Sequence, residues 1–404
     1  MKQKFSALDQ FLTQHQLFWR FEPFFCQDKT TYPWALTHPE LNEWLDALTF
    51  SDLEQYQSNF VSLLQSLECW IPGISEHYFA LENSISHHDN ESPLAIDTKP
   101  LSVGIPGRKL KQITALTQQI STEGIRGVPW LEWCAGKGYL GRFLANQHQG
   151  AVTSVELQQA LCDDGQDFAN QHHLDMTFCQ GDALKPEAKR WFTHHQHVVA
   201  LHACGDLHLR MLEHAVMAKS EGISFSPCCY HLTKDELYRP LSSSARHSQL
   251  NFTRQELRIP LQETVTGGQR VKRHRQQEMT FRLGLDLWVK SVLGSDVYCS
   301  VPSIKKSVLS EGFHAFCQWA CELKGWPQPS AEQAGCYEKL GDIRFEQMEK
   351  ASLVQHAFRR MIEWWLIFDR ALYLEDAGYH VVITEFCSRL LTPRNFLIQA
   401  RLKR

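Results

Sequence analysis

Residues 131–141 decide the fold, and they read Leu-Glu-Trp-Cys-Ala-Gly-Lys-Gly-Tyr-Leu-Gly. The apolar run 128–133 predicts a short strand, and residues 139–146 can start a helix. Between them the glycines follow the pattern Gly136-x-Gly138-x-x-Gly141, which permits a tight turn and lets a ligand approach the backbone at a helix N-terminus. A plain strand-to-helix turn also shows this pattern, so the flanking sequence has to decide between the two.

The sequence after this turn alternates between strand-like and helix-like segments. Strands are predicted at residues 151–156, 176–179, 197–202 and 222–225, with helices reaching residue 172 and spanning 207–219. Such alternation indicates a parallel sheet with right-handed crossovers. Two further strand-like runs, 381–385 and 396–400, predict a closing hairpin. The expected fold is therefore an α/β Rossmann-like sheet with an antiparallel last strand.

The length of 404 residues predicts two or three domains. We expect a helical amino-terminal domain at 1–82, a linker at 83–104 and a Rossmann-like core at 105–232. A basic and helical insertion should follow at 233–375, with its clearest helix at 353–375. The last segment, 376–404, should supply the strand pair that completes the core sheet.

Composition places the chain among soluble globular proteins, with 43% hydrophobic and 21% charged residues. No apolar run approaches the roughly 20 residues that cross a bilayer, so we expect no membrane partner. The first 18 residues resemble an amphipathic helix and lack the blocks of a signal peptide. The 13 cysteines are odd in number and fit a reducing compartment, so a cytoplasmic location is expected.

Acidic residues stand at the ends of three successive predicted strands, namely Glu132, Glu156 and Asp182. Glu156 can accept hydrogen bonds from ribose hydroxyls, Asp182 can meet an adenine amino group, and Glu132 can attract a positively charged amino-acid end. This set suits the cationic cofactor S-adenosylmethionine better than a pyrophosphate-bearing one. An NAD-binding oxidoreductase is the rival interpretation. The predicted cofactor-binding residues are Glu132, Ala135, Gly136, Gly138, Glu156, Leu157, Asp182, Ala183 and His202.

The fourth and fifth predicted strands end in residues that should line the crevice of an open α/β sheet. The predicted catalytic residues are His202, Cys204, Asp206, Cys228 and His231. A base among them helps when the methyl acceptor is a hydroxyl or an amine. The cysteines, including Cys229, allow three interpretations: small residues in a crowded crevice, zinc ligands, or a nucleophile that attacks a pyrimidine. We favour the first and expect no metal.

Charge is unevenly distributed along the chain. Residues 1–100 hold 14 acidic and 5 basic side chains, whereas residues 239–282 hold nine basic side chains against three acidic ones. The second window can contact a polyanion, or it can be an ordinary solvated surface. If it contacts an RNA substrate, the predicted phosphate-binding residues are Arg270, Lys272, Arg273 and Arg275.

Three groups of motifs resemble the class I methyltransferase family that contains the eukaryotic acceptor-stem tRNA 2′-O-methyltransferase and methyltransferase-like paralogues. They are Glu132-x-x-Ala135-Gly136-Lys137-Gly138-Tyr139-Leu140, His202-x-Cys204-Gly205, and Ser226-Pro227-Cys228-Cys229-Tyr230-His231. The basic segment 107–111 resembles the start of the family's leading helix and adds Lys109 to the predicted substrate-binding residues. The resemblance covers residues 104–232 well and 353–404 moderately.

The resemblance implies a class I methyltransferase sheet that uses S-adenosylmethionine and acts on RNA, either tRNA or rRNA. A ribose 2′-hydroxyl is favoured over a base as the acceptor. A methyltransferase of a protein or a small molecule is the alternative, and a non-catalytic scaffold is a third class. The oligomeric state is not predicted.

Overall fold

The computed structural model describes residues 1–26, 28, 30–87, 99–120, 127–148, 150–262, 269–304 and 309–403. The chain forms two compact units, and each unit is assembled from separate stretches of sequence. The first unit comprises residues 1–14, 76–266 and 359–404, and the second comprises 15–75 and 267–358. Among the described residues, no helix has both the length and the apolar character that a bilayer span requires.

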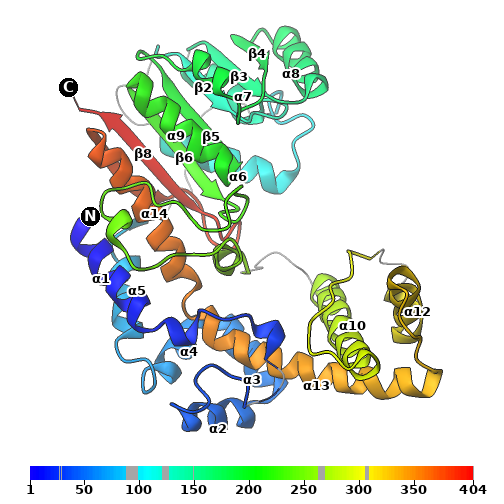
Figure 1. The fold of residues 1–404 in the computed structure, drawn as a ribbon. Helices are drawn as coiled ribbons and strands as arrows, with labels where there is room; N and C mark the ends of the chain where they lie inside the picture. The colour runs from blue at the N-terminus through cyan, green and yellow to red at the C-terminus, as the bar shows by residue number, and fades with distance from the viewer. Residues whose placement is uncertain are drawn as a thin grey trace. The chain divides into compact units, whose positions relative to one another are not determined.

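An eight-stranded sheet with the order β1-β7-β8-β6-β5-β2-β3-β4 forms the centre of the first unit (Figure 1). β8 runs antiparallel to both of its neighbours, while the remaining pairs are parallel. The expectation of a Rossmann-like sheet with an antiparallel last strand is therefore confirmed. The strands are β1 Ser86–His87, β2 Trp130–Trp133, β3 Val152–Glu156, β4 Met176–Gln180, β5 His197–Cys204, β6 Gly222–Cys228, β7 Tyr379–Glu385 and β8 Phe396–Leu402.

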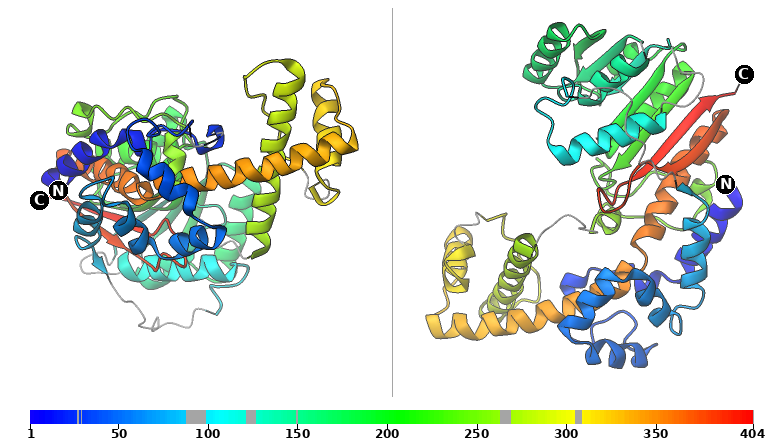
Figure 2. Two further views of the ribbon diagram at one scale, coloured as in Figure 1. Left: turned by 90° about the horizontal axis from the view of Figure 1, so that it is seen from below. Right: turned by 180° about the vertical axis from the view of Figure 1, so that it is seen from behind.

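Helices cover both faces of this sheet, and Figures 1 and 2 show α9 on one side and α6 on the other. On the α6 side, Trp130, Val152 and Val199 share a core with α6 and α7. On the α9 side, Arg370 Nε of α14 donates to His208 Nε2 of α9 at 2.8 Å. Burial on both faces explains why β6 is apolar or small along its whole length. The helices of this unit are α1 Lys2–Gln14, α5 Ile74–Glu82, α6 Gly107–Ile120, α7 Tyr139–His148, α8 Gln159–Gln171, α9 Asp206–Ala218 and α14 Arg359–Asp376.

The second unit is helical, and its longest helix is α13, along which α10 packs (Figure 2). Its core holds a charged pair, since Arg344 Nη1 lies 2.6 Å from Asp286 Oδ2 and both side chains are nearly fully buried. Capping boxes at Thr49 and Ser330 fix the starts of α3 and α13. The helices are α2 Pro39–Ala47, α3 Phe50–Ser58, α4 Phe60–Leu67, α10 Gln269–Leu293, α12 Phe313–Lys324 and α13 Ala331–His356.

Short 3-10 helices complete the described structure. In the first unit they are Pro186–Trp191, Ala245–His247 and Glu256–Gln262, and in the second Gln16–Phe18 and Pro23–Phe25.

The units cut across the blocks that the sequence suggests. Residues 1–14 and 76–82 of the expected amino-terminal domain join the sheet unit, as do 233–262 and 359–375 of the expected insertion. The expected helix at 353–375 is wrong as a single element, because α13 ends at His356 and α14 begins at Arg359. Residues 88–98 of the expected linker and 263–268 of the basic window lie outside the described residues.

Candidate active site

The glycine turn between β2 and α7 is held in a left-handed backbone conformation. Cys134, Gly136 and Gly138 have φ angles of 56°, 60° and 65°. A Cβ atom added to Gly136 would meet no other atom within 4 Å, whereas one added to Gly138 would collide with the ring of Phe178. Gly136 therefore leaves open space for a ligand, and Gly138 is required by the packing of the turn itself.

Glu156, at the end of β3, is fixed against this turn. Its Oε2 accepts a hydrogen bond from the Gly136 N–H at 2.9 Å, and its Oε1 accepts one from the Gln158 N–H at 3.0 Å. Each carboxylate oxygen keeps a further lone pair. The next side chain, Leu157, is 58% exposed although it is apolar. This pairing of a fixed acid with an exposed apolar side chain fits a ribose and its base.

Asp182 follows β4 and shapes the next loop, since its Oδ1 accepts a hydrogen bond from the Leu184 N–H at 2.9 Å. The neighbouring Ala183 is buried. Cys134 lies among these groups: burial raises its pKa to about 12, with further raising contributions from Glu156, Cys204 and Asp182. The ends of β2, β3, β4 and β5 therefore meet at one edge of the sheet, where an open α/β sheet is expected to have its crevice.

Glu132 lies under the glycine turn and is only 3% exposed. Its Oε2 accepts a hydrogen bond from Ser154 Oγ at 2.8 Å. Burial raises its pKa to about 7, although the Ser154 hydrogen bond, the Gly141 N–H and the charges of Lys109 and Arg142 oppose the shift. The side chain therefore lies out of solvent and is close to half ionised at neutral pH.

Lys109, on α6, lies beside the same turn. Its Nζ is 4.7 Å from the centre of the Tyr139 ring. Burial lowers its pKa, and the charge of Glu132 raises it in part. Lys109 is thus a cation near the crevice, and it adds to the positive potential at His202.

His202 interrupts β5 with a φ angle of 65°, and the pairing of β5 with β6 shifts register between Leu201 and Cys204. Its Nε2 lies 2.9 Å from Gln112 Oε1. Since an amide oxygen only accepts, Nε2 carries the proton and Nδ1 is left as an acceptor. Burial, followed by the charge of Lys109, lowers the pKa of His202 to about 4, so the ring is neutral at physiological pH.

Three cysteine sulfurs gather at the ends of β5 and β6. Cys204 Sγ lies 3.1 Å from Cys228 Sγ, and the sulfurs of Cys204, Cys228 and Cys229 all lie within 4.8 Å of one another. Hydrogen bonds with Cys204 and Cys229, together with burial, raise the pKa of Cys228. The predicted catalytic cysteines are therefore brought together, with Cys229 as a third member.

The other two predicted catalytic residues have different surroundings. Asp206 Oδ2 accepts a hydrogen bond from the Lys234 N–H at 2.8 Å, and the Asp206 N–H donates to Leu232 O at 3.0 Å. These contacts give Asp206 a structural role in holding the loop after β6. His231 Nδ1 is shielded from solvent and has no hydrogen-bond partner among the described residues.

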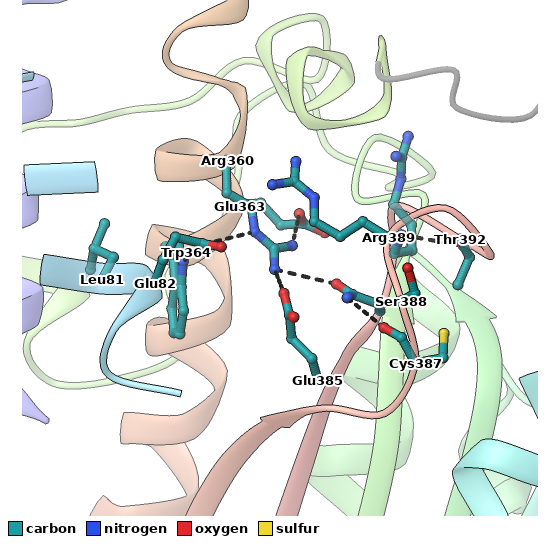
Figure 3. A network of polar contacts seen from close by, with 12 residues as sticks. Leu81, Glu82, Arg360, Glu363, Trp364, Glu385, Cys387, Ser388, Arg389 and Thr392 are labelled. Carbon is teal, nitrogen blue, oxygen red and sulfur yellow. Dashed lines mark hydrogen bonds and ion pairs between the residues drawn. The ribbon is translucent and has the colours of Figure 1, made fainter. Parts of the chain in front are cut away.

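A buried network joins the strand pair to α14 (Figure 3). Arg360 is 2% exposed, and its guanidinium contacts Glu82, Glu363 and Glu385. Tyr230, which follows Cys229, donates from its hydroxyl to Glu363 Oε1 at 3.2 Å. The turn that carries Cys228 and Cys229 is therefore anchored to buried charges.

The predicted phosphate-binding residues lie on α10 in the second unit, whereas the crevice lies in the first. Arg270 and Arg273 line an open groove of about 660 Å³ together with His274, Glu338 and Asp342. Arg275 Nη2 is instead 2.8 Å from Glu349 Oε1. The basic window is thus divided, because Arg239, Arg246, Arg254 and Arg258 belong to the first unit.

Three residues that hold the site were not predicted from the sequence. Gln112, Ser154 and Tyr230 act through contacts with His202, Glu132 and Glu363, and two of these three contacts span at least 90 residues of sequence. Only Tyr230 carried a local signal, because it belongs to the conspicuous 226–231 motif.

Comparison with known proteins identifies the class of this domain. Residues 108–236 match a protein family described as a methyltransferase domain. Comparison with curated proteins gives no match. Together with the strand order and the antiparallel β8, the family match makes residues 108–236 a methyltransferase domain of the Rossmann-like type, and S-adenosylmethionine is its cofactor.

Three solved structures illustrate the likeness. The chain is 15% identical to TrmN from Thermus thermophilus, with a TM-score of 0.26, over 31% of this chain and 41% of that one. It is 13% identical to a SAM-dependent methyltransferase from Aquifex aeolicus, with a TM-score of 0.25, over 32% and 72% of the two chains. A tRNA (uracil-54, C5)-methyltransferase from Pyrococcus abyssi, solved with S-adenosylhomocysteine, is 19% identical, with a TM-score of 0.24, over 29% of this chain and 28% of that one. The match thus spans less than half the length of two of these proteins, and the low scores carry no argument about a substrate.

Proposed function

We propose that the chain transfers the methyl group of S-adenosylmethionine to an RNA, and that a ribose 2′-hydroxyl is favoured over a base. The observation that carries the methyl-transfer part is the fixed position of Glu156. Two backbone N–H groups hold its carboxylate beside the open space at Gly136 and the exposed Leu157. The cofactor supplies the methyl group, and the protein supplies alignment.

The preference for a hydroxyl acceptor is supported by His202. Its contact with Gln112 fixes the tautomer that leaves Nδ1 as a proton acceptor. A hydroxyl that attacks a methyl group must lose its proton, and a positioned acceptor assists that loss. The hydroxyl oxygen would bond to the methyl carbon as the sulfur–methyl bond breaks, S-adenosylhomocysteine would leave, and the hydroxyl proton would pass to His202 or to water.

Methylation of a pyrimidine carbon is less well supported. That chemistry needs a free thiolate that attacks the ring. Cys204 and Cys228 instead contact each other, sulfur to sulfur, at 3.1 Å. Neither sulfur is set apart as a lone nucleophile.

RNA as the substrate class is supported by the basic side chains of α10. Arg270 and Arg273 line an open groove, and Lys272 lies between them in sequence and is exposed. Guanidinium groups bind phosphates through paired hydrogen bonds. The resemblance of the 226–231 motif to an RNA-modifying family points the same way. A protein or small molecule as the acceptor remains the alternative class.

The salt dependence of RNA binding tests this substrate class. We expect the variant Arg270→Ala/Lys272→Ala/Arg273→Ala/Arg275→Ala to bind RNA more weakly and to lower the slope of log affinity against log salt by up to about 3. Of the four replacements, Arg275→Ala should contribute least, because Arg275 is already paired with Glu349.

A matched control replaces Lys4, Lys189, Arg210 and Lys403 with alanine, because these are exposed residues of the first unit outside the basic window. An unchanged slope in the α10 variant, with S-adenosylmethionine binding intact, would remove the RNA proposal and favour a protein or small-molecule acceptor. Digestion of methylated RNA to nucleosides, followed by mass spectrometry, separates a 2′-O-methyl product from a methylated base.

A further inference from the structure

The three sulfurs at the ends of β5 and β6 are arranged like ligands of a single ion. The sulfurs of Cys204, Cys228 and Cys229 lie within 4.8 Å of one another, and the closest pair is 3.1 Å apart. Around a tetrahedral zinc with Zn–S bonds of about 2.3 Å, two thiolates lie roughly 3.8 Å apart. The closest observed pair is nearer than that value, and no pair of the three sulfurs is more than 4.8 Å apart. Small side-chain rotations would therefore suffice to accommodate an ion.

The backbone brings these sulfurs together by departing from regular strand geometry. Successive residues of a strand point to opposite faces, so two adjacent cysteines would normally diverge. Cys229 has a φ angle of 46°, which turns the chain directly after Cys228, the last residue of β6. On β5, the left-handed His202 and the register shift before Cys204 mark an irregularity of the kind that re-aims a side chain.

This arrangement exceeds what simple packing requires. A residue other than glycine in a left-handed conformation costs about 1–3 kcal/mol and persists where the surrounding structure compels it, often at functional sites. Isolated buried cysteines act as small apolar side chains and need no such geometry. Here the left-handed conformations of His202 and Cys229 bring three sulfurs together. This cost in backbone strain indicates that the sulfurs bind a common ligand.

We propose that Cys204, Cys228 and Cys229 bind a Zn²⁺ ion through their thiolates. Soft thiolate ligands select zinc over magnesium or calcium. On binding, each S–H releases its proton to solvent, and the ion remains divalent, so no electrons are transferred. Cys204 and Cys229 are half-buried, so an ion can reach the site from the crevice.

His231 lies outside the group of three converging sulfurs, and it is the candidate for the fourth ligand after a rotation of its side chain. Its Nδ1 is shielded from solvent and has no hydrogen-bond partner among the described residues, although it is a polar atom. His231 stands two residues after Cys229 and interacts electrostatically with it. An imidazole nitrogen is the usual companion of thiolates in four-coordinate zinc sites.

The site goes beyond methyl transfer, because it requires neither a particular acceptor nor the cofactor. The ion would tie the end of β5 to the turn after β6, where both line the crevice. It would also occupy the cysteines that an attack on a pyrimidine would need.

Metal uptake by the intact wild-type chain is the first test, and it depends on no variant. The chain is purified under reducing conditions, stripped with a chelator, loaded with Co²⁺, and passed through a desalting column. We expect about one retained equivalent, with the visible bands of tetrahedral cobalt and a near-ultraviolet thiolate-to-cobalt charge-transfer band. A reduced chain that retains no cobalt, or whose bound cobalt shows no thiolate band, overturns the proposal.

Single substitutions then assign the ligands. Cys204→Ser, Cys228→Ser and Cys229→Ser should each weaken zinc binding by at least about tenfold, the lower limit seen when even an outer partner of a metal ligand is lost. Cys179→Ser, at a half-buried cysteine of β4, is the matched control and should bind zinc like the wild type. Circular dichroism and S-adenosylmethionine binding check that each variant is folded. Full zinc affinity in all three ligand variants overturns the site.

The variant His231→Gln tests the fourth ligand separately. It should retain the three-thiolate band while losing affinity and shifting the visible cobalt bands. An unchanged spectrum and affinity would overturn the assignment of His231 and leave that position to water. Loss of zinc binding with cofactor binding intact separates this proposal from the proposed methyl transfer.

Discussion

Left-handed backbone at residues other than glycine concentrates at the crevice. Cys134, His202 and Cys229 have positive φ angles, and they stand where β2, β5 and β6 end. Strain of this kind is stored where the surrounding structure enforces it. At the scale of single residues, the crevice is therefore a preorganised part of the fold.

The acids at the strand ends could be predicted from sequence, whereas their partners could not. The fixed distance from Gly136 to Glu156 reflects one helix and one strand, which is a local relation along the chain. The contact of His202 with Gln112 joins residues 90 positions apart and depends on how α6 packs on the sheet. The left-handed turn at Cys229 also leaves no signal, because cysteine has no preference for that conformation.

Glu132 leads to a prediction about pH. Since burial raises its pKa to about 7, the side chain is largely neutral below that pH in the free protein. A cationic cofactor favours the ionised carboxylate, so binding should lower this pKa and release a proton. We therefore expect the affinity for S-adenosylmethionine to fall by up to about tenfold for each pH unit below 7, and to level off above it.

Calorimetry at several pH values, in buffers of different ionisation enthalpy, measures both the affinity and the released proton. Glu132→Gln should flatten the pH profile of the affinity and abolish the proton release. Any pH dependence that this variant keeps comes from titration of the cofactor itself, so the variant is also the baseline. A wild-type profile as flat as that of the variant would show that Glu132 does not sense the cofactor.

At the scale of elements, local patterns predicted the sheet, but they predicted one helix at 353–375 where the structure has two. The strand at 222–225 extends to Cys228 because small and buried residues continue past Phe225. The helix expected at 353–375 is interrupted at residues 357–358, although the sequence there contains neither glycine nor proline. Buried apolar residues stand before, within and after the break. The hydrophobic periodicity is therefore continuous and does not predict the break.

The start of α14 leads to a prediction about stability. Arg360 neutralises three carboxylates that belong to α5, α14 and β7, as Figure 3 shows. Replacing it with methionine removes the cation that these acids share, and neutral donors such as the Tyr230 hydroxyl do not replace its charge. We expect Arg360→Met to lower the free energy of unfolding by about 3–5 kcal/mol. Chemical denaturation of the sheet unit within the full chain, followed by circular dichroism, measures this change.

The control for this prediction is Arg210→Met, which removes the exposed ion pair with Glu213 on α9. An exposed pair of this kind contributes about 0–1 kcal/mol, so the control should unfold nearly like the wild type. If both variants lose the same small amount, the buried network is not the anchor of the strand pair and the cysteine turn.

At the scale of the whole molecule, the chain builds two units from interleaved stretches. Residues 15–75 belong with 267–358 because of contacts such as that of Gln355 Nε2 with Trp19 O at 2.8 Å. Composition cannot reveal such an assembly, since a helical stretch has the same pattern in whichever unit it packs. The sequence therefore predicted the sheet and the helical character of its additions, while the division into units required the structure.

Calorimetric binding of S-adenosylmethionine, S-adenosylhomocysteine and NAD to the full chain tests the central claim most directly. We expect the first two to bind and NAD not to bind. Glu156→Ala should weaken S-adenosylmethionine binding by at least about tenfold, because hydrogen bonds to a charged group are lost, while the exposed Glu187→Ala leaves it unchanged. Binding of NAD alone would contradict the claim and would return the glycine turn to a dinucleotide-binding oxidoreductase.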